Sequence, residues 1–436
     1  MKKITRRAIS HLLIMAIVLF GVGVYVVKLL ENGASWALYF SRLNSGSSGV
    51  LHDRNGELLA EFSRNGSFYA EDALTRKACF HILGDYEGRT GSGLISTFTE
   101  EIKEYSIFTD TTHSQDFEFT LTLDAALNRA AYEAIGEDRE GAVLVCNYKT
   151  GEILCMVSAP STDPLYYDPD PPSGTYINKC LGATFVPGSV FKLVTSAAAI
   201  ETVSNIWDRQ FFCEGEGEIA GVKIACVDPH WTTNFRTALS NSCNYAFAQI
   251  AVTVGQDNMK RYVKEYGFTD RHELNGIPTA AGNFETAYMG DPELAWAGIG
   301  QWTDLICPYS LLRYVSAIAN GGMLIEPYII EGTETQTVQL ITPSTADTLR
   351  DMMRFNVTDR YGDDRFPGLI MCGKSGTAEV GDGTNNSWFT GFLDDEEHPY
   401  AFVVLIEKGG YGLADAGSVA NTVMYTAVRK NASEKP

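Results

Sequence analysis

Basic residues are scarce in this chain of 436 amino acids, which has 34 lysines and arginines against 54 aspartates and glutamates. The formal net charge is −20 at pH 7, and no run rich in lysine or arginine follows the first few residues. Binding to a phosphate backbone depends on such positive charge. We therefore expect no nucleic-acid partner.

Motifs for common metals and nucleotide cofactors are also missing. The seven histidines include no H-E-x-x-H pattern, and the nine cysteines include no C-x-x-C pattern. Glycine-rich loops of the Walker or Rossmann type do not occur either. The sequence thus predicts neither a metal site nor a cofactor.

The odd number of cysteines excludes a disulfide framework that pairs all of them within one chain. Cys213 and Cys226 are the pair of interest, because they flank the turn-rich segment 214–221, which can bring two short strands together. The two side chains can form a disulfide, or both can remain small buried thiols in an anaerobic habitat. The sequence leaves both alternatives open.

A long apolar run occupies residues 9–27. At about 1.5 Å per residue it can cross a bilayer core of roughly 30 Å. Four basic residues precede it, and the positive-inside rule keeps them in the cytoplasm. We expect a cytoplasmic tail at 1–8, a single transmembrane anchor at 9–30 in the cell membrane, and an extracytoplasmic catalytic part. The alternative is a signal peptide cleaved near Gly33.

The rest of the chain is long enough for two domains, because one core serves about 100 to 200 residues. Residues 31–115 alternate short strand-like runs with polar stretches, including a hairpin turn at 53–56, and predict a small β-rich spacer domain. From 116 to 436, strand patterns near both ends enclose a mainly helical middle. This order predicts an α+β domain in which early and late strands share one antiparallel sheet, with helices around it.

The strongest chemical signal is Ser189 at the start of an apolar helical run, with Lys192 one turn later. Residues three apart on a helix share a face, so the amine can activate the hydroxyl. Burial favours the neutral amine that such activation requires. The helix N-terminus also offers N–H groups to a developing oxyanion. An S-x-x-K pattern alone is weak, since a serine here is commonly only a helix cap.

Two further motifs follow. Ser242-Cys243-Asn244 precedes a second helical stretch, and Lys374-Ser375-Gly376-Thr377 occupies a predicted strand, where the glycine leaves room for a substrate backbone. Each alone is commonly a turn or a strand bulge. Two chance matches, Ser63-Arg64-Asn65 and Lys149-Thr150-Gly151, precede Ser189 and so fall out of order. The ordered set S-x-x-K, S-x-N and K-[ST]-G is highly specific.

In these motifs the chain resembles the penicillin-binding proteins, serine transpeptidases of bacterial cell-wall synthesis that share a fold with serine β-lactamases. The single anchor, the 53–56 turn and the short spacer resemble class B members, which lack a glycosyltransferase domain. The resemblance implies a peptidoglycan D,D-transpeptidase that cross-links stem peptides and is inhibited by β-lactams. It also implies a glycosyltransferase partner in the elongation or division machinery.

Carried over to this chain, the resemblance implies that Ser189 attacks a D-Ala-D-Ala carbonyl, Lys192 accepts its proton, and Ser242 relays a proton to the leaving D-alanine. Lys374 joins these three as a catalytic residue. Asn244 would hold the substrate amide. Lys374, Ser375 and Thr377 would bind the terminal carboxylate, and the N–H groups of Ser189 and Thr377 would form the oxyanion hole.

The sequence also departs from the family pattern. The spacer is shorter than usual, tryptophan follows His230 where glycine is common, and the run 178–180 is altered. Three alternatives to transpeptidation stay open: a D,D-carboxypeptidase, a β-lactamase, and a β-lactam sensor or silent division scaffold. Intact Ser189, Lys192 and Lys374 argue against a silent scaffold.

Overall fold

The computed structural model describes residues 11, 14–24, 27, 49–63, 66–85, 88–101, 117–219, 221–285 and 290–433. Residues 14–24 are helical. Within the described ranges, no helix combines the length and the apolar character that a membrane crossing requires. The predicted tail 1–8 lies outside the described residues and the predicted anchor 9–30 lies only partly within them, so both stay predictions.

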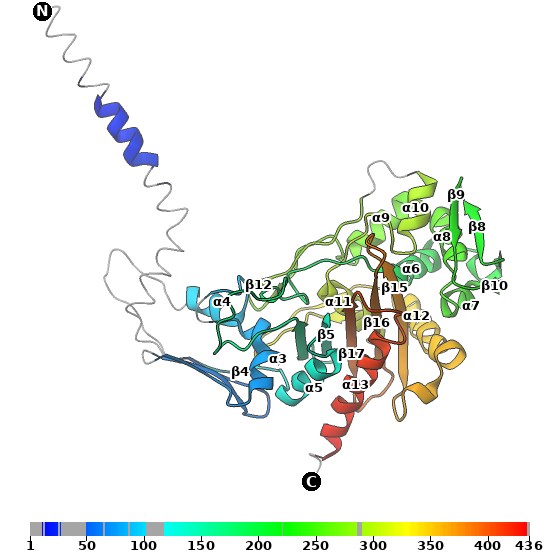
Figure 1. The fold of residues 1–436 in the computed structure, drawn as a ribbon. Coiled ribbons are helices and arrows are strands. Elements are labelled where there is room, and N and C mark those ends of the chain that lie inside the picture. The colour runs from blue at the N-terminus through cyan, green and yellow to red at the C-terminus, as the bar shows by residue number, and fades with distance from the viewer. Residues whose placement is uncertain are drawn as a thin grey trace, which may run out of the picture.

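A five-stranded antiparallel sheet forms the centre of the molecule (Figure 1). Its two N-terminal strands lie beside the three C-terminal ones, so early and late segments share one sheet and the α+β prediction is confirmed. The strand order is β15 (Met371–Glu379), β16 (Asn385–Leu393), β17 (Tyr400–Glu407), β5 (Glu140–Asn147) and β6 (Ile153–Ala159).

Apolar residues pack on both faces of this sheet. Successive side chains of a strand point to opposite faces, so each strand contributes to two apolar clusters. On β17, Val403 and Leu405 belong to one apolar cluster, while Val404 and Ile406 belong to the other. The second cluster includes residues of α5 (Ala125–Ile135) and α13 (Ala416–Ser433), and the first includes residues of α6 (Lys192–Thr202), α8 (Asn244–Val254), α11 (Pro308–Ala319) and α12 (Pro343–Phe355).

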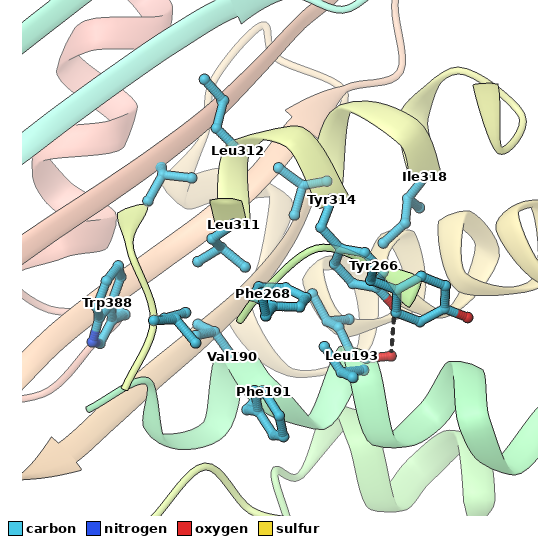
Figure 2. Close-up of a cluster of buried hydrophobic side chains, with 14 of the residues drawn as sticks. Val190, Phe191, Leu193, Tyr266, Phe268, Leu311, Leu312, Tyr314, Ile318 and Trp388 are labelled. Carbon is cyan, nitrogen blue, oxygen red and sulfur yellow. Dashed lines mark hydrogen bonds between the residues drawn. The ribbon is translucent and has the colours of Figure 1, made fainter. Parts of the chain in front are cut away.

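The core between α6 and α11 fixes the helix that carries Ser189 (Figure 2). Phe191 and Phe268 stack edge to face, and Tyr314 donates a hydrogen bond of 3.1 Å from its hydroxyl to the Leu193 carbonyl. All four side chains are almost fully buried. The start of α6 is therefore set by packing on the sheet side.

Shorter elements connect and flank these layers. They are η1 (Gly188–Phe191), η2 (Ile206–Asp208), β7 (Gln210–Cys213), β8 (Glu216–Ile219), β9 (Val222–Ala225), β10 (Trp231–Asn234), α7 (Phe235–Ser240), α9 (Gln256–Glu265), β11 (Glu273–Leu274), β12 (Ile277–Pro278), α10 (Asp291–Ala297), β13 (Met323–Ile325), β14 (Thr337–Gln339), η3 (Asn356–Tyr361) and η4 (Asp363–Arg365). Of these, η1, α7, η3 and the β8–β9 hairpin border the site described below.

The N-terminal region forms a second, four-stranded sheet with two helices. Its elements are β1 (Gly49–His52), β2 (Leu58–Ser63), β3 (Gly66–Tyr69), α3 (Ala73–Leu83), α4 (Leu94–Glu101) and β4 (Phe117–Thr120), and the sheet order is β3-β2-β1-β4. The predicted turn at 53–56 joins β1 to β2, with Gly56 at φ +81°. The predicted boundary at 115/116 falls among residues that are not described, so the division into domains stays a prediction.

This second sheet is not independent of the central domain. Leu51 and Leu59 belong to the same apolar cluster as residues of α6 and α11. Arg76 of α3 pairs with Asp163, which follows β6, at 2.6 Å between Nη2 and Oδ2, and both side chains are largely buried. One continuous core therefore joins the described part of the spacer to the catalytic region.

Candidate active site

The three motifs predicted from the sequence converge at the β15 edge of the central sheet. Ser189 lies in η1, where the chain enters α6, and Gly188 before it has φ +55°. A Cβ atom on Gly188 would lie 2.7 Å from the Thr377 carbonyl oxygen. The backbone of the first motif thus lies directly against β15, which carries the third motif, and only glycine permits this approach.

Lys192 points from the first turn of the helix toward the hydroxyl of Ser189, and the Nζ to Oγ distance is 3.0 Å. The same amine lies 2.7 Å from the Ser242 carbonyl oxygen and 2.7 Å from Asn244 Oδ1. All of these partners are uncharged oxygens, and the side chain is fully buried. Burial disfavours the ammonium and lowers the pKa of Lys192 to about 8.

Ser242 occupies the turn between α7 and α8 with a left-handed backbone, φ +53°. Its Oγ lies 3.3 Å from Lys192 Nζ and 3.0 Å from Lys374 Nζ. Lys374 is also fully buried, and desolvation followed by the charge of Lys192 lowers its pKa well below the ordinary value. One hydroxyl therefore connects two buried amines, an arrangement suited to passing protons between them.

The remaining side chains of the third motif lie on β15 between η1 and η3. Ser375 is half-buried, and Tyr361 of η3 accepts a hydrogen bond of 3.1 Å from its backbone N–H. Thr377 is half-buried, and its hydroxyl accepts a hydrogen bond of 3.2 Å from the Gly412 N–H. Two hydroxyl-bearing residues of this strand are thus half-buried, while the lysine of the same motif is fully buried.

Gly376 is required by packing within the protein itself. The sequence suggested that this glycine leaves room for a substrate backbone. In the structure, a Cβ atom there would lie 3.0 Å from Val190 Cγ1 and 3.1 Å from the Pro187 carbonyl oxygen. The space beside Gly376 is thus taken by η1, and the glycine lets the first motif approach the third.

Asn244 joins the site to the neighbouring hairpin. Its Oδ1 accepts from Lys192, and its Nδ2 donates a hydrogen bond of 2.8 Å to the Ala225 carbonyl at the end of β9. The side chain is half-buried. The amide therefore orients the catalytic lysine and fastens the β8–β9 hairpin to the second motif.

Two supporting residues were not found by sequence reasoning. Tyr361 contacts Ser375 through both the backbone N–H and the side-chain Oγ, the latter at 3.1 Å. Gly300 accepts a hydrogen bond of 2.8 Å from the Gly188 N–H and so holds the turn before Ser189. Neither residue belongs to a recognisable motif, and both meet their partners through tertiary contacts, so no local pattern could have identified them.

The cysteines are all described, and none forms a disulfide. Cys213 and Cys226 do come together at the base of the predicted hairpin, with 3.7 Å between their sulfur atoms. Of the two alternatives that the sequence left open, the structure contains the pair of thiols.

Comparison with known proteins decides the family. The model of the penicillin-binding protein transpeptidase domain matches residues 141–425. The chain belongs to the penicillin-binding transpeptidase family. All three motifs lie inside the matched range, and the β-lactamase/transpeptidase-like fold predicted from them is confirmed.

Several curated relatives of this penicillin-binding transpeptidase are similar over the same region. Stage V sporulation protein D of Bacillus subtilis is 30% identical over 321 residues, which cover 68% of this chain and 49% of that protein. Peptidoglycan D,D-transpeptidase PbpA of Mycolicibacterium smegmatis is 27% identical over 339 residues, which cover 68% of each chain. The chain thus spans about half the length of the first relative and two thirds of the second.

Solved structures agree with this assignment. The D,D-transpeptidase domain of a peptidoglycan glycosyltransferase from Eggerthella lenta is 25% identical, with a TM-score of 0.76 over 89% of this chain and 99% of that one. Penicillin-binding protein A of M. tuberculosis, solved as a penicillin G acyl-enzyme complex, has a TM-score of 0.74 at 22% identity, covering 88% of this chain and 100% of that one. The second likeness establishes the fold alone.

Proposed function

We propose that this protein is a peptidoglycan D,D-transpeptidase that cross-links stem peptides through an acyl-enzyme on Ser189 and is acylated by β-lactams. The observation that carries the proposal is the contact of 3.0 Å between Ser189 Oγ and Lys192 Nζ, in a fully buried setting that lowers the pKa of the amine to about 8. A neutral lysine at that distance can take the proton of the serine as the oxygen attacks a carbonyl.

Acylation follows from the geometry. As Ser189 Oγ bonds to the carbonyl carbon of the penultimate D-alanine, its proton moves to Lys192. The N–H groups of Ser189 and Thr377 stabilise the oxyanion. Ser189 lies in the first turn of η1, where N–H groups have no intrahelical acceptor, and Thr377 contributes its N–H from β15. Ser242 Oγ, between the two lysine amines, donates a proton to the leaving D-alanine nitrogen and is reprotonated from the amines.

Substrate binding involves the same wall of the site. Ser375 and Thr377 are half-buried and carry hydroxyls, which can donate hydrogen bonds to the terminal carboxylate of a D-Ala-D-Ala peptide. The buried amine of Lys374 attracts the negative charge of that carboxylate. The acyl group then passes to an amine of a neighbouring stem peptide in transpeptidation, or to water in a D,D-carboxypeptidase reaction.

Location is part of the proposal. We propose that residues 9–30 anchor the protein in the cell membrane, with the catalytic region outside the cytoplasm, where stem peptides are found. The apolar run and the basic residues before it support this orientation. We also propose a glycosyltransferase partner, because this chain spans a transpeptidase domain and cross-linking requires newly made glycan strands.

The test is to label the protein with a fluorescent penicillin and map the modified residue by mass spectrometry. We expect one long-lived acyl group on Ser189 and none on Ser189→Ala. Ser196→Ala is the matched control, because Ser196 lies on the same helix with its hydroxyl buried and unpartnered within the described chain, and it should label normally. Labelling of Ser189→Ala would refute the nucleophile, and rapid loss of the acyl group would indicate a β-lactamase.

The acceptor is tested separately. With a D-Ala-D-Ala pentapeptide and a second stem peptide carrying a free amine, the proposal expects a cross-linked dimer and released D-alanine. Release of D-alanine without dimer, over a range of acceptor concentrations, would assign the protein as a D,D-carboxypeptidase. Complementation of a deletion strain by Ser189→Ala would instead support a scaffold role.

A further inference from the structure

A cluster of three cysteines and one histidine lies beside the second motif. Cys213 ends β7, Cys226 follows β9, His230 precedes β10, and Cys243 separates Ser242 from Asn244. The sulfur atoms of Cys226 and Cys243 are 3.8 Å apart, and Cys213 Sγ lies 3.7 Å from both Cys226 Sγ and His230 Nδ1. All four potential ligand atoms lie within 4.8 Å of one another.

These separations fit a shared metal ion better than a disulfide. A sulfur–sulfur bond is about 2.04 Å long, far shorter than either distance in the cluster. A tetrahedral zinc ion with bonds of about 2.3 Å to sulfur holds two sulfur ligands about 3.8 Å apart. A disulfide would also leave one cysteine and the imidazole unused, whereas tetrahedral coordination uses all four groups.

We infer that Cys213, Cys226, His230 and Cys243 form a structural zinc site. Three thiolates and one imidazole are a common closed zinc set, and soft sulfur donors select Zn²⁺ over magnesium or calcium. Binding one Zn²⁺ releases the three thiol protons, and no oxidant is required. The donors follow a C-x₁₂-C-x₃-H-x₁₂-C spacing and include no C-x-x-C pair.

The surrounding backbone already holds the ligands close to one another. The Cys226 N–H donates to the Gly215 carbonyl at 2.7 Å, and the His230 N–H donates to the Cys213 carbonyl at 3.0 Å. The site thus joins both ends of the β8–β9 hairpin to the beginning of α8. In Figure 1 this hairpin lies beside α8, at the same end of the molecule as α7.

The zinc site would position the second motif. Cys243 is the central residue of Ser242-Cys243-Asn244, and its fixed position would constrain the left-handed turn at Ser242, φ +53°, that aims a carbonyl and a hydroxyl at Lys192. The hairpin held by the metal also supplies the Ala225 carbonyl that binds Asn244. This consequence for catalysis rests on the proposed function, whereas metal binding does not.

The experiment is to purify the whole chain in detergent without chelators, under reducing and zinc-replete conditions, and to measure metal by mass spectrometry. We expect close to one zinc per chain. His230→Ala and Cys226→Ser should retain less than about one tenth of that content. His230→Cys, which restores four donors, and Cys79→Ala, a buried cysteine of α3 outside the cluster, should keep it.

Cobalt provides a readout that does not depend on activity. The zinc-stripped protein reconstituted with Co²⁺ should show the visible absorption of tetrahedral thiolate coordination, and Cys226→Ser should not. A wild-type protein that binds neither ion, or that contains a disulfide between Cys213 and Cys226 by peptide mapping under these reducing conditions, would overturn the inference.

Penicillin acylation distinguishes this inference from the proposed function. Zinc removal should slow Ser189 acylation about tenfold or more and re-addition should restore it, as loss of supporting contacts at a functional site typically does. Zinc bound with acylation unaffected by its removal would refute the positioning role. Zinc bound in a chain that is never acylated would refute the proposed function and leave the metal site standing.

Discussion

The two sides of the active site are held in place by different means. On one side, Ser189 and β15 meet through backbone contacts, with Gly188 and Gly376 allowing η1 to lie directly on a strand of the central sheet. On the other side, Ser242 lies in a left-handed turn, and side-chain contacts to Lys192 and Lys374 fix it. The first side is part of the core, and the second rests against a two-stranded hairpin.

This difference indicates where the site can adapt. Ser189 lies in η1, which packs directly on a sheet whose strands are largely buried, so a displacement there must disturb close packing. The β8–β9 hairpin alternates exposed and half-buried residues along β8, and Ile224 of β9 is the one residue of its two strands that is fully buried. The proton relay is therefore expected to respond to changes in the hairpin, while the nucleophile and its helix stay fixed.

The largest effect is expected from breaking the contact that joins the two sides, with Lys192→Met. This change removes the base of Ser189 and leaves the Ser242 carbonyl and Asn244 Oδ1 without their donor. General-base catalysis contributes about 10²- to 10⁴-fold, so penicillin acylation should slow by about that factor. Stopped-flow or quenched labelling measures the rate, and a loss of less than tenfold would reject Lys192 as the base.

The pH dependence sharpens the same assignment. Because burial lowers the pKa of Lys192 to about 8, the amine is protonated and inactive as a base below that pH and neutral above it. The acylation rate should rise with pH up to about 8 and then level off, and at two pH units below the pKa it should be about a hundredfold lower. Ser196→Ala should give the same profile.

A substitution at Asn244, on the hairpin side of the site, should shift the dependence of the acylation rate on pH. Asn244→Asp places a carboxylate where the Oδ1 atom now lies 2.7 Å from the amine. An opposite charge at that distance favours the ammonium and raises the pKa of Lys192, so the rise in acylation should move to higher pH. An unchanged profile would show that another group sets it.

The backbone contact between η1 and β15 can be disrupted with Gly188→Ala. The added Cβ would lie 2.7 Å from the Thr377 carbonyl oxygen and 2.9 Å from Ala378 Cβ, at a φ of +55°. Overpacking of this kind costs about 1–3 kcal/mol, so acylation should fall roughly 5- to 150-fold. Gly332→Ala is the matched control, because its φ is +79° and a Cβ there meets nothing within 4 Å. An equal loss of acylation rate in the Gly188→Ala and Gly332→Ala variants would show that backbone strain alone, and not the contact with β15, causes the effect.

Sequence reasoning succeeded where chemistry is encoded locally. The S-x-x-K spacing predicted a shared helix face, and the structure places the Ser189 and Lys192 side chains in contact. Strand patterns near both ends of the catalytic region predicted a common sheet, which the structure confirms. What the sequence could not predict depends on tertiary contacts: the approach of Tyr361 to Ser375 and the meeting of four donors spread over residues 213–243.

The smallest effect is expected from Tyr361→Phe, which tests how far the sheet side depends on side chains at all. The tyrosine hydroxyl contacts both the N–H and the Oγ of Ser375 at 3.1 Å, while β15 itself is fixed by its pairing with β16. Loss of a neutral hydrogen bond costs about 0.5–1.5 kcal/mol, so KM for a D-Ala-D-Ala peptide should rise about 2- to 12-fold with kcat nearly unchanged. A large fall in kcat with unchanged KM would show that the tyrosine acts on the reaction itself, and the sheet side would then depend on side chains as the hairpin side does.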